Sequence, residues 1–89
     1  ETSTDLATLA VIMSSFRGLA LPSDLVLYGE VGLSGEIRPV PSGQERIQEA
    51  LKHGFKRCII PYGNKPRTDI AGMDIQLIKT LPELLSILF

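Results

Sequence analysis

The chain has 89 residues, of which 44% are hydrophobic and 21% are charged, and its formal net charge is −1. This length allows one domain at most, and the near-neutral charge gives no global sign of affinity for nucleic acid. One cysteine, one histidine and no apolar run of the roughly 18 residues in a membrane span predict a cytoplasmic protein with no zinc site and no membrane contact.

Helical spacing of apolar residues from Leu6 to Phe16 predicts a first helix over about 4–17, ended by Gly18. The helix has a Thr-Ser-Thr run at positions 2–4 as its candidate N-caps. The segment from Leu25 to Leu33 then predicts a strand. A turn at Ser34-Gly35 leads into a second strand from Glu36 to Val40, so the two strands form a hairpin.

Prolines at 39 and 41 cannot donate to a ladder and should end the second strand. The later elements are predicted as a helix from Ser42-Gly43 to Gly54, a buried strand over 55–60 that holds Cys58, a turn at 61–67, a strand over 74–78 and a closing helix over 81–89. The order α-β-β-α-β-β-α predicts an α/β (α+β) fold with helices covering a sheet. No strand precedes the first helix, so we expect residues 1–89 to be a fragment that lacks its upstream strands.

Three motifs carry a family resemblance, ETSTDLA at 1–7, GEVGLSGEIRPV at 29–40 and QERIQEA at 44–50. Through them the whole chain resembles the C-terminal Lon protease-like domain of the RadA/Sms family of bacterial DNA repair proteins. The resemblance implies a partial Lon proteolytic-domain-like fold, of the ribosomal protein S5 domain 2-like class. It also implies that Ser3 occupies the position of the protease nucleophile and Gln44 that of the catalytic lysine.

Gln44 in that position predicts a degenerate dyad. A serine hydroxyl needs a neighbouring base to take its proton, and a carboxamide has no such proton affinity. Lys52 lies eight positions further along the same helix, roughly 12 Å away, and cannot reach the same place. Asp5, close behind the serine, would oppose the negative charge that develops in a peptidase transition state. The simpler interpretation of Ser3 is a helix N-cap.

A second feature is a basic window without acidic residues. Basic clusters bind phosphate backbones, although most are solvated, so a DNA-binding surface remains an alternative. Its residues are Lys52, Lys56, Arg57, Lys65 and Arg67, with His53 at a helix C-terminus as a dipole partner. Arg38 and Arg46 flank the degenerate site and are expected to pair with Glu30, Glu36 or Glu45 across an interface.

The resemblance therefore implies a Lon-like oligomerisation scaffold without peptidase activity. Its parent would be a RadA-like repair ATPase, assembled as a hexameric ring, that promotes branch migration. ATP, Mg and Zn are expected in the parent protein, and no cofactor is expected in these residues. The alternatives are a working Ser-Lys peptidase domain and a DNA-binding surface of the ring.

Overall fold

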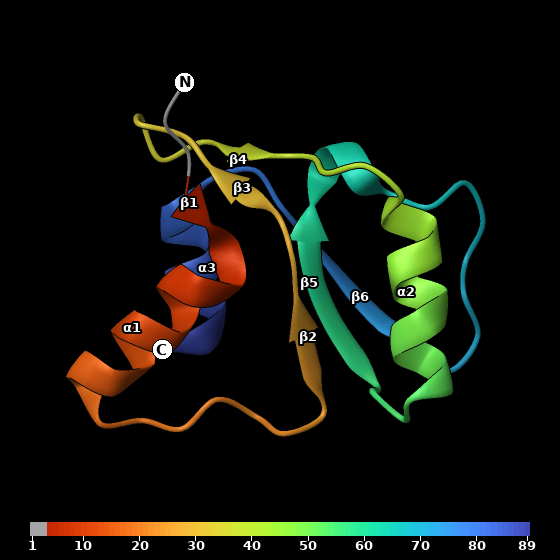
Figure 1. Cartoon of the computed structure of the whole chain (residues 1–89), viewed down its shortest axis with the longest axis horizontal. Coiled ribbons are helices and arrows are strands. Elements are labelled where there is room, and N and C mark those ends of the chain that lie inside the picture. The colour runs from red at the N-terminus through yellow and green to blue at the C-terminus, as the bar shows by residue number, and fades with distance from the viewer. Residues whose placement is uncertain (1–3) are drawn as a thin grey trace.

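The computed structural model describes residues 4–89, which form two small sheets and three helices (Figure 1). A parallel sheet has the order β2-β5-β6, and an antiparallel sheet has the order β1-β3-β4. The elements are β1 (Thr4–Asp5), α1 (Leu6–Arg17), β2 (Leu25–Leu27), β3 (Glu30–Val31), β4 (Ile37–Arg38), α2 (Gly43–Lys52), β5 (Arg57–Pro61), the 3-10 turn η1 (Tyr62–Asn64), β6 (Asp74–Ile78) and α3 (Leu81–Leu88). The mixed α/β fold predicted from the sequence is confirmed.

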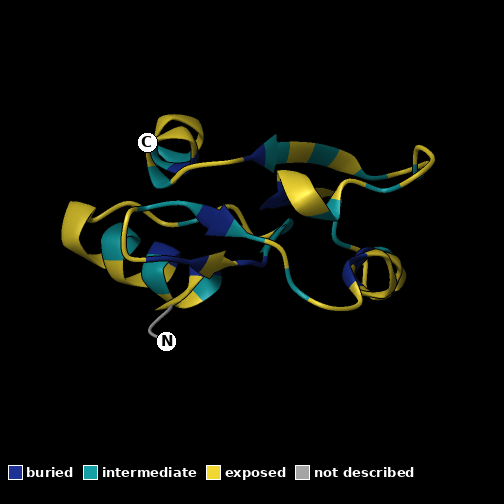
Figure 2. Ribbon diagram, turned by 90° about the horizontal axis from the view of Figure 1, so that it is seen from above, coloured by how far each residue is buried: buried dark blue, intermediate teal, exposed yellow. Residues whose placement is uncertain are grey.

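The parallel sheet has helices on both sides, with α2 on one side and α1 and α3 on the other (Figures 1 and 2). Side chains alternate along β5, so that Cys58 and Ile60 join the core under α2, whereas Ile59 joins the core under α1 and α3. The second of these cores also contains the fully buried Leu6 and Leu84. The sheet therefore separates two apolar clusters.

The prediction of one strand from Leu25 to Leu33 is wrong, because the chain changes sheets inside it. β2 pairs parallel to β5, and β3 pairs antiparallel to β4. The break falls at Gly29, whose φ of 144° is a conformation that L side chains rarely adopt. A Cβ there would also lie 3.0 Å from Cγ of Pro61. The bend at Gly29 directs β3 away from the parallel sheet.

The hairpin predicted after this strand is confirmed as β3 and β4, with Gly35 N–H donating to the Gly32 carbonyl at 3.0 Å. Within β4, Ile37 N–H donates a hydrogen bond of 2.9 Å to the carbonyl of Lys79, the residue that directly follows β6. This bond joins the hairpin to the segment between β6 and α3. The two sheets are thereby held together at this end of the molecule.

The first helix begins two residues later than predicted. Its N-cap is Asp5, whose carboxylate accepts a hydrogen bond from Thr8 N–H at 2.9 Å. The assignment of the cap to residues 2–4 is therefore wrong. Thr4 and Asp5 instead pair with Val31 and Glu30 as strand β1. The sequence analysis missed this strand because two residues carry no periodicity.

The closing helix was predicted from Thr80 and Pro82, and it is confirmed with a capping box. Thr80 accepts from Glu83 N–H, while the Glu83 carboxylate accepts from the N–H groups of Lys79 and Thr80 at 2.8 and 2.9 Å. No helix among residues 4–89 is long and apolar enough to cross a bilayer.

Candidate functional site

The entry to α2 is the best-defined polar structure near the degenerate site. The Asn64 side chain lies across the loop that leads into the helix and bonds both backbone groups of Val40: it accepts from the N–H at 2.9 Å and donates to the carbonyl at 2.9 Å. A Cβ on Gly43 would lie 2.5 Å from Nδ2 of Asn64, so only glycine fits here without a shift. The contact positions the first turn of α2 against η1.

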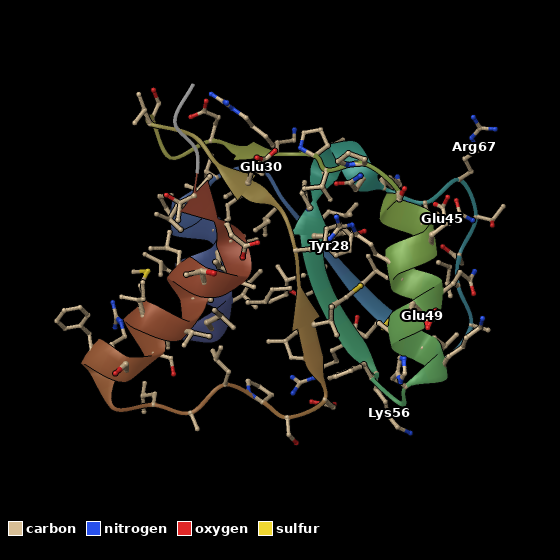
Figure 3. The ribbon with its side chains drawn as sticks, viewed as in Figure 1. Tyr28, Glu30, Glu45, Glu49, Lys56 and Arg67 are labelled. Atoms are coloured by element: carbon tan, nitrogen blue, oxygen red, sulfur yellow. The ribbon has the colours of Figure 1, made fainter. Side chains whose placement is uncertain are left out.

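Tyr28 anchors the same turn from the parallel sheet (Figure 3). Its buried hydroxyl donates to the Gly43 carbonyl at 2.9 Å. Burial raises the pKa of Tyr28 to about 12, so the hydroxyl stays protonated and can donate. The Arg46 guanidinium lies over the Tyr28 ring, 5.7 Å from its centroid, and donates to the Pro41 carbonyl. Tyr28 and Asn64 thus fix the helix that carries Gln44.

Gln44 lies in the first turn of α2, as predicted, with an exposed side chain. It lines an open depression on the outer side of the helix together with Glu45, Gln48, Glu49 and Lys52. Spacings of four and eight residues place Gln48 and Lys52 on the same side of the helix, one and two turns further along. Lys52 therefore stays two turns away from the position of Gln44.

Ser3, the other position of the dyad, lies outside the described residues. Asp5, two positions further along the chain, is paired in register with Glu30 of β3. Both carboxylates line a depression of about 330 Å³ that is completed by Tyr28, Gly29, Val40, Pro41 and Arg46. Gln44 does not line this depression. The ionisable groups in it are two carboxylates and one guanidinium, and it contains no amine.

Arg38 and Arg46 do not behave alike. Arg38 pairs with Glu36 of its own chain, with 2.8 Å between Nη2 and Oε2, so the pairing predicted across an interface is intramolecular for these two residues. Arg46 lies over the Tyr28 ring and donates a hydrogen bond to the Pro41 carbonyl. Sequence reasoning passed over Tyr28 and Asn64 as site residues, since a tyrosine in a strand and an asparagine in a turn give no separate signal.

The basic window of the sequence is dispersed in three dimensions. Lys56 lies at the start of β5, whereas Arg67 projects from the loop after η1, towards the opposite end of α2, and Glu45 and Glu49 lie between them (Figure 3). Lys65 lines a depression that also contains Asp69. His53 is the C-cap of α2 and contacts Glu49 at 3.4 Å. Carboxylates from outside the window thus accompany most of these cations.

Arg57 is the cation of the window with a bidentate ion pair. Its Nη2 lies 2.8 Å from Oδ1 of Asp24, and its Nε lies 3.3 Å from both carboxylate oxygens. These hydrogen bonds lower the pKa of Asp24 and raise the pKa of Arg57. Both groups are solvent-exposed, so the pair restrains the side chain more than it stabilises the fold.

A separate feature is the apolar outer surface of α1. Phe16 is 88% exposed, and Val11, Ile12 and Leu19 are each about half exposed. Val11, Ile12 and Phe16 line an open depression together with Ser15. Arg17 is the only charged residue in this helix, and it stacks on Phe89 at 4.8 Å. A helix with so many exposed apolar side chains presents a surface suited to another protein surface.

The chain is similar to a known protein family and to several bacterial proteins. The family model of the Lon protease (S16) C-terminal proteolytic domain matches residues 2–88. The chain is 60% identical to a DNA repair protein RadA of Haemophilus influenzae over 99% of its own length and 19% of that protein. For the RadA proteins of Escherichia coli and Pseudomonas aeruginosa the identities are 59% and 56%, over 98% and 100% of this chain and 19% and 20% of theirs.

These matches confirm the resemblance on which the sequence analysis relied, and with it the Lon proteolytic-domain-like fold. The chain spans about a fifth of the length of the curated relatives it matches.

Proposed function

Because the chain belongs to the family of the Lon protease C-terminal proteolytic domain, we propose that it is a non-proteolytic Lon-like module that holds together the subunits of a DNA repair protein similar to RadA. The parent protein is a ring, hexameric by the family resemblance, that uses ATP to drive branch migration of recombination intermediates. In this proposal the domain contributes assembly, and the chemistry belongs to other parts of the parent.

The observation that carries the loss of peptidase activity is the exposed carboxamide of Gln44 at the lysine position. A Ser-Lys dyad depends on a neutral amine that removes the hydroxyl proton, and loss of a general base typically lowers the rate by ~10²–10⁴-fold. The depression beside β1 contains no amine that could replace the lysine. Asp5 in it already accepts the capping bond from Thr8, and the guanidinium of Arg46 offers only hydrogen-bond donors.

The apolar surface of α1 supports the assembly role. Burying a side chain such as Phe16 in a subunit contact stabilises that contact by about 1.5–3 kcal/mol, or roughly 10- to 150-fold in the association constant. The surface contains no charge to desolvate apart from Arg17 at its end. We assign the subunit contact to Val11, Ile12, Phe16 and Leu19.

In this proposal, ATP, Mg and Zn bind to parts of the parent outside this chain. Among the described residues there is no group of three His, Cys, Asp or Glu side chains that could hold a metal ion. No Gly-Lys-Ser/Thr phosphate loop occurs in the sequence either.

The assembly role is tested by sedimentation velocity of the full-length parent with Phe16→Ser. We expect the ring-sized species to dissociate at protein concentrations where the wild type stays assembled. Leu33→Ser is the matched control, because Leu33 at the hairpin turn is 86% exposed and lies off the α1 surface. An intact ring in Phe16→Ser, or equal dissociation in both variants, would contradict the assignment.

The loss of peptidase activity is tested with a fluorophosphonate probe on the assembled parent. We expect no labelling of Ser3 above the level of the Ser3→Ala variant. Gln44→Lys then reports whether the lysine alone is missing. Strong labelling of Ser3 in the unmodified protein would refute the proposal.

A further inference from the structure

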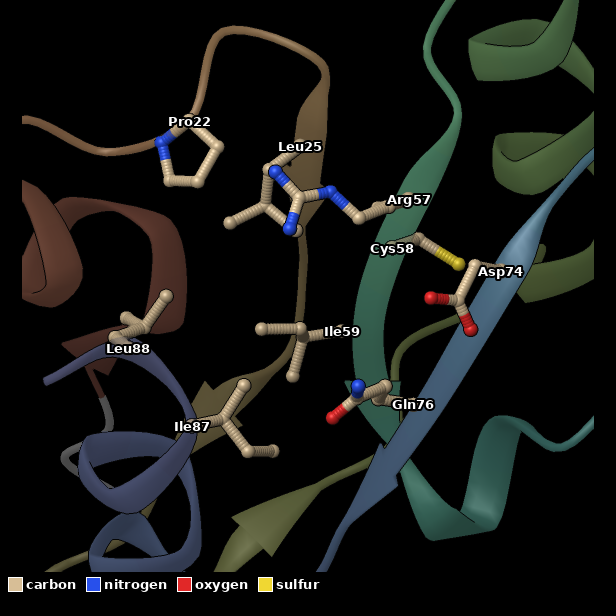
Figure 4. Close-up of a pocket in the computed structure, with 9 residues that line it drawn as sticks. All are labelled: Pro22, Leu25, Arg57, Cys58, Ile59, Asp74, Gln76, Ile87 and Leu88. Atoms are coloured by element: carbon tan, nitrogen blue, oxygen red, sulfur yellow. The ribbon is translucent and has the colours of Figure 1, made fainter.

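A small pocket lies on the α3 side of the parallel sheet, beside the C-terminal end of α3 (Figure 4). It has a volume of about 70 Å³ and spans all three strands of that sheet. The lining residues are Pro22, Leu25, Arg57, Cys58, Ile59, Asp74, Gln76, Ile87 and Leu88. None of them belongs to the degenerate dyad, to the α2 entry or to the α1 surface.

The inner part of the pocket is apolar. Leu25 and Ile59 come from the sheet, and Ile87 and Leu88 come from the last turn of α3 (Figure 4). Ile87 is 43% exposed, so this wall faces solvent although it consists of aliphatic groups. A water molecule among these side chains would lack hydrogen-bond partners. An aliphatic side chain of four carbons is the group that best matches this size and chemistry.

The rim of the pocket carries a carboxylate that makes no side-chain hydrogen bond. Asp74 is paired in register with Arg57, an arrangement that ordinarily makes a cross-strand ion pair. Arg57 instead directs its guanidinium towards Asp24 and bonds both of its oxygens. Arg57 still feels the charge of Asp74, but the Asp74 carboxylate forms no hydrogen bond or close ion pair among residues 4–89; its backbone N–H donates to the Lys56 carbonyl at 2.9 Å.

Gln76 adds a hydrogen-bonding group to the same rim. Its carboxamide is exposed, lies next to Asp74 on the edge strand β6 (Figure 4) and makes no hydrogen bond within the described part of the chain. A carboxylate and a carboxamide whose side chains make no hydrogen bonds, above an apolar floor, are the pattern of a site that orients a ligand.

We propose that this pocket binds a peptide segment of a partner protein that presents a leucine-like side chain next to a lysine or arginine. The aliphatic group fills the pocket between Ile59 and Ile87, the cation pairs with Asp74, and Gln76 bonds the peptide backbone. Charge complementarity selects this occupant, because an acidic residue in the same place would be repelled by the Asp74 carboxylate. The site is independent of the proposed assembly surface.

L-leucinamide is a small molecule that carries both the isobutyl group and the cation, since its amine is protonated at about pH 6.5. In the full-length parent protein, methyl NMR signals of Ile59 and Ile87 report its binding directly, once assigned by single Ile→Val substitutions. We expect saturable shifts at both methyl groups with a dissociation constant of roughly 1–10 mM, as suits so small a ligand. Two control ligands each lack one of these groups. Isovalerate has the same isobutyl group but carries a negative charge, and glycinamide has the cation but no isobutyl group. Both should bind at least tenfold more weakly.

Asp74→Asn should weaken leucinamide binding about fivefold or more, and Asp69→Asn, the same change in a loop away from the pocket, should leave it unchanged. The proposal is overturned by unsaturable shifts, by isovalerate binding as well as leucinamide, or by an Asp74→Asn variant that binds normally.

Discussion

Removal of the Asn64 side chain tests how the entry to α2 is held. Asn64→Ala deletes both hydrogen bonds to Val40, each 2.9 Å long, and leaves two half-buried backbone groups to water. Each such bond contributes about 0.5–1.5 kcal/mol, so we expect a loss of about 1–3 kcal/mol in the free energy of unfolding of this domain. A loss of that size corresponds to roughly 5- to 150-fold more frequent opening.

Hydrogen exchange of the β5 amides in the intact parent protein measures this loss. These amides are in the middle of the parallel sheet and exchange when the domain unfolds, so their exchange rates report its stability. Asn64→Asp retains the acceptor for Val40 N–H but loses the donor to the Val40 carbonyl, and it should fall between wild type and Asn64→Ala. Gln48→Ala, at an exposed position of α2, is the control. Unchanged β5 exchange in Asn64→Ala would refute the idea that the side chain holds this loop.

Three further outcomes follow from the structure. Gly29→Ala should destabilise the domain by about 2 kcal/mol or more, because φ is positive and a Cβ would contact Pro61, and the same exchange measurement checks it. Glu83→Gln should destabilise the domain at neutral pH, and the difference from wild type should shrink progressively once the pH falls below 4.5, the ordinary glutamate pKa, in melting curves taken across pH. This pH dependence is expected because hydrogen bonds from the backbone N–H groups of Lys79 and Thr80 lower the pKa of Glu83. The ionised carboxylate therefore stabilises the fold, and protonation removes that stabilisation. Cys58 should resist iodoacetamide at about pH 8 in native protein and react on unfolding, as peptide mass spectrometry would show, because it is buried and its pKa is raised to about 11.

Local features were predictable because their causes lie within a few residues. Helical periodicity placed α1 and α3 to within two residues of their ends, and the capping box of α3 depends on two residues three positions apart. The place of Gln44 at the lysine position comes from the family resemblance and stays a prediction. The chain's own sequence therefore determined the helices and the hairpin.

Only the tertiary structure decided how distant segments combine. Whether residues 25–33 form one strand or two depends on β5 and β4 as partners, and a run of apolar residues is compatible with either arrangement. The basic window looked uncompensated because the carboxylate that pairs with Arg57 lies 33 positions earlier, at Asp24. That ion pair also leaves the Asp74 carboxylate without a hydrogen bond among the described residues. Charge and pairing act through space, and a linear sequence does not show which residues become neighbours.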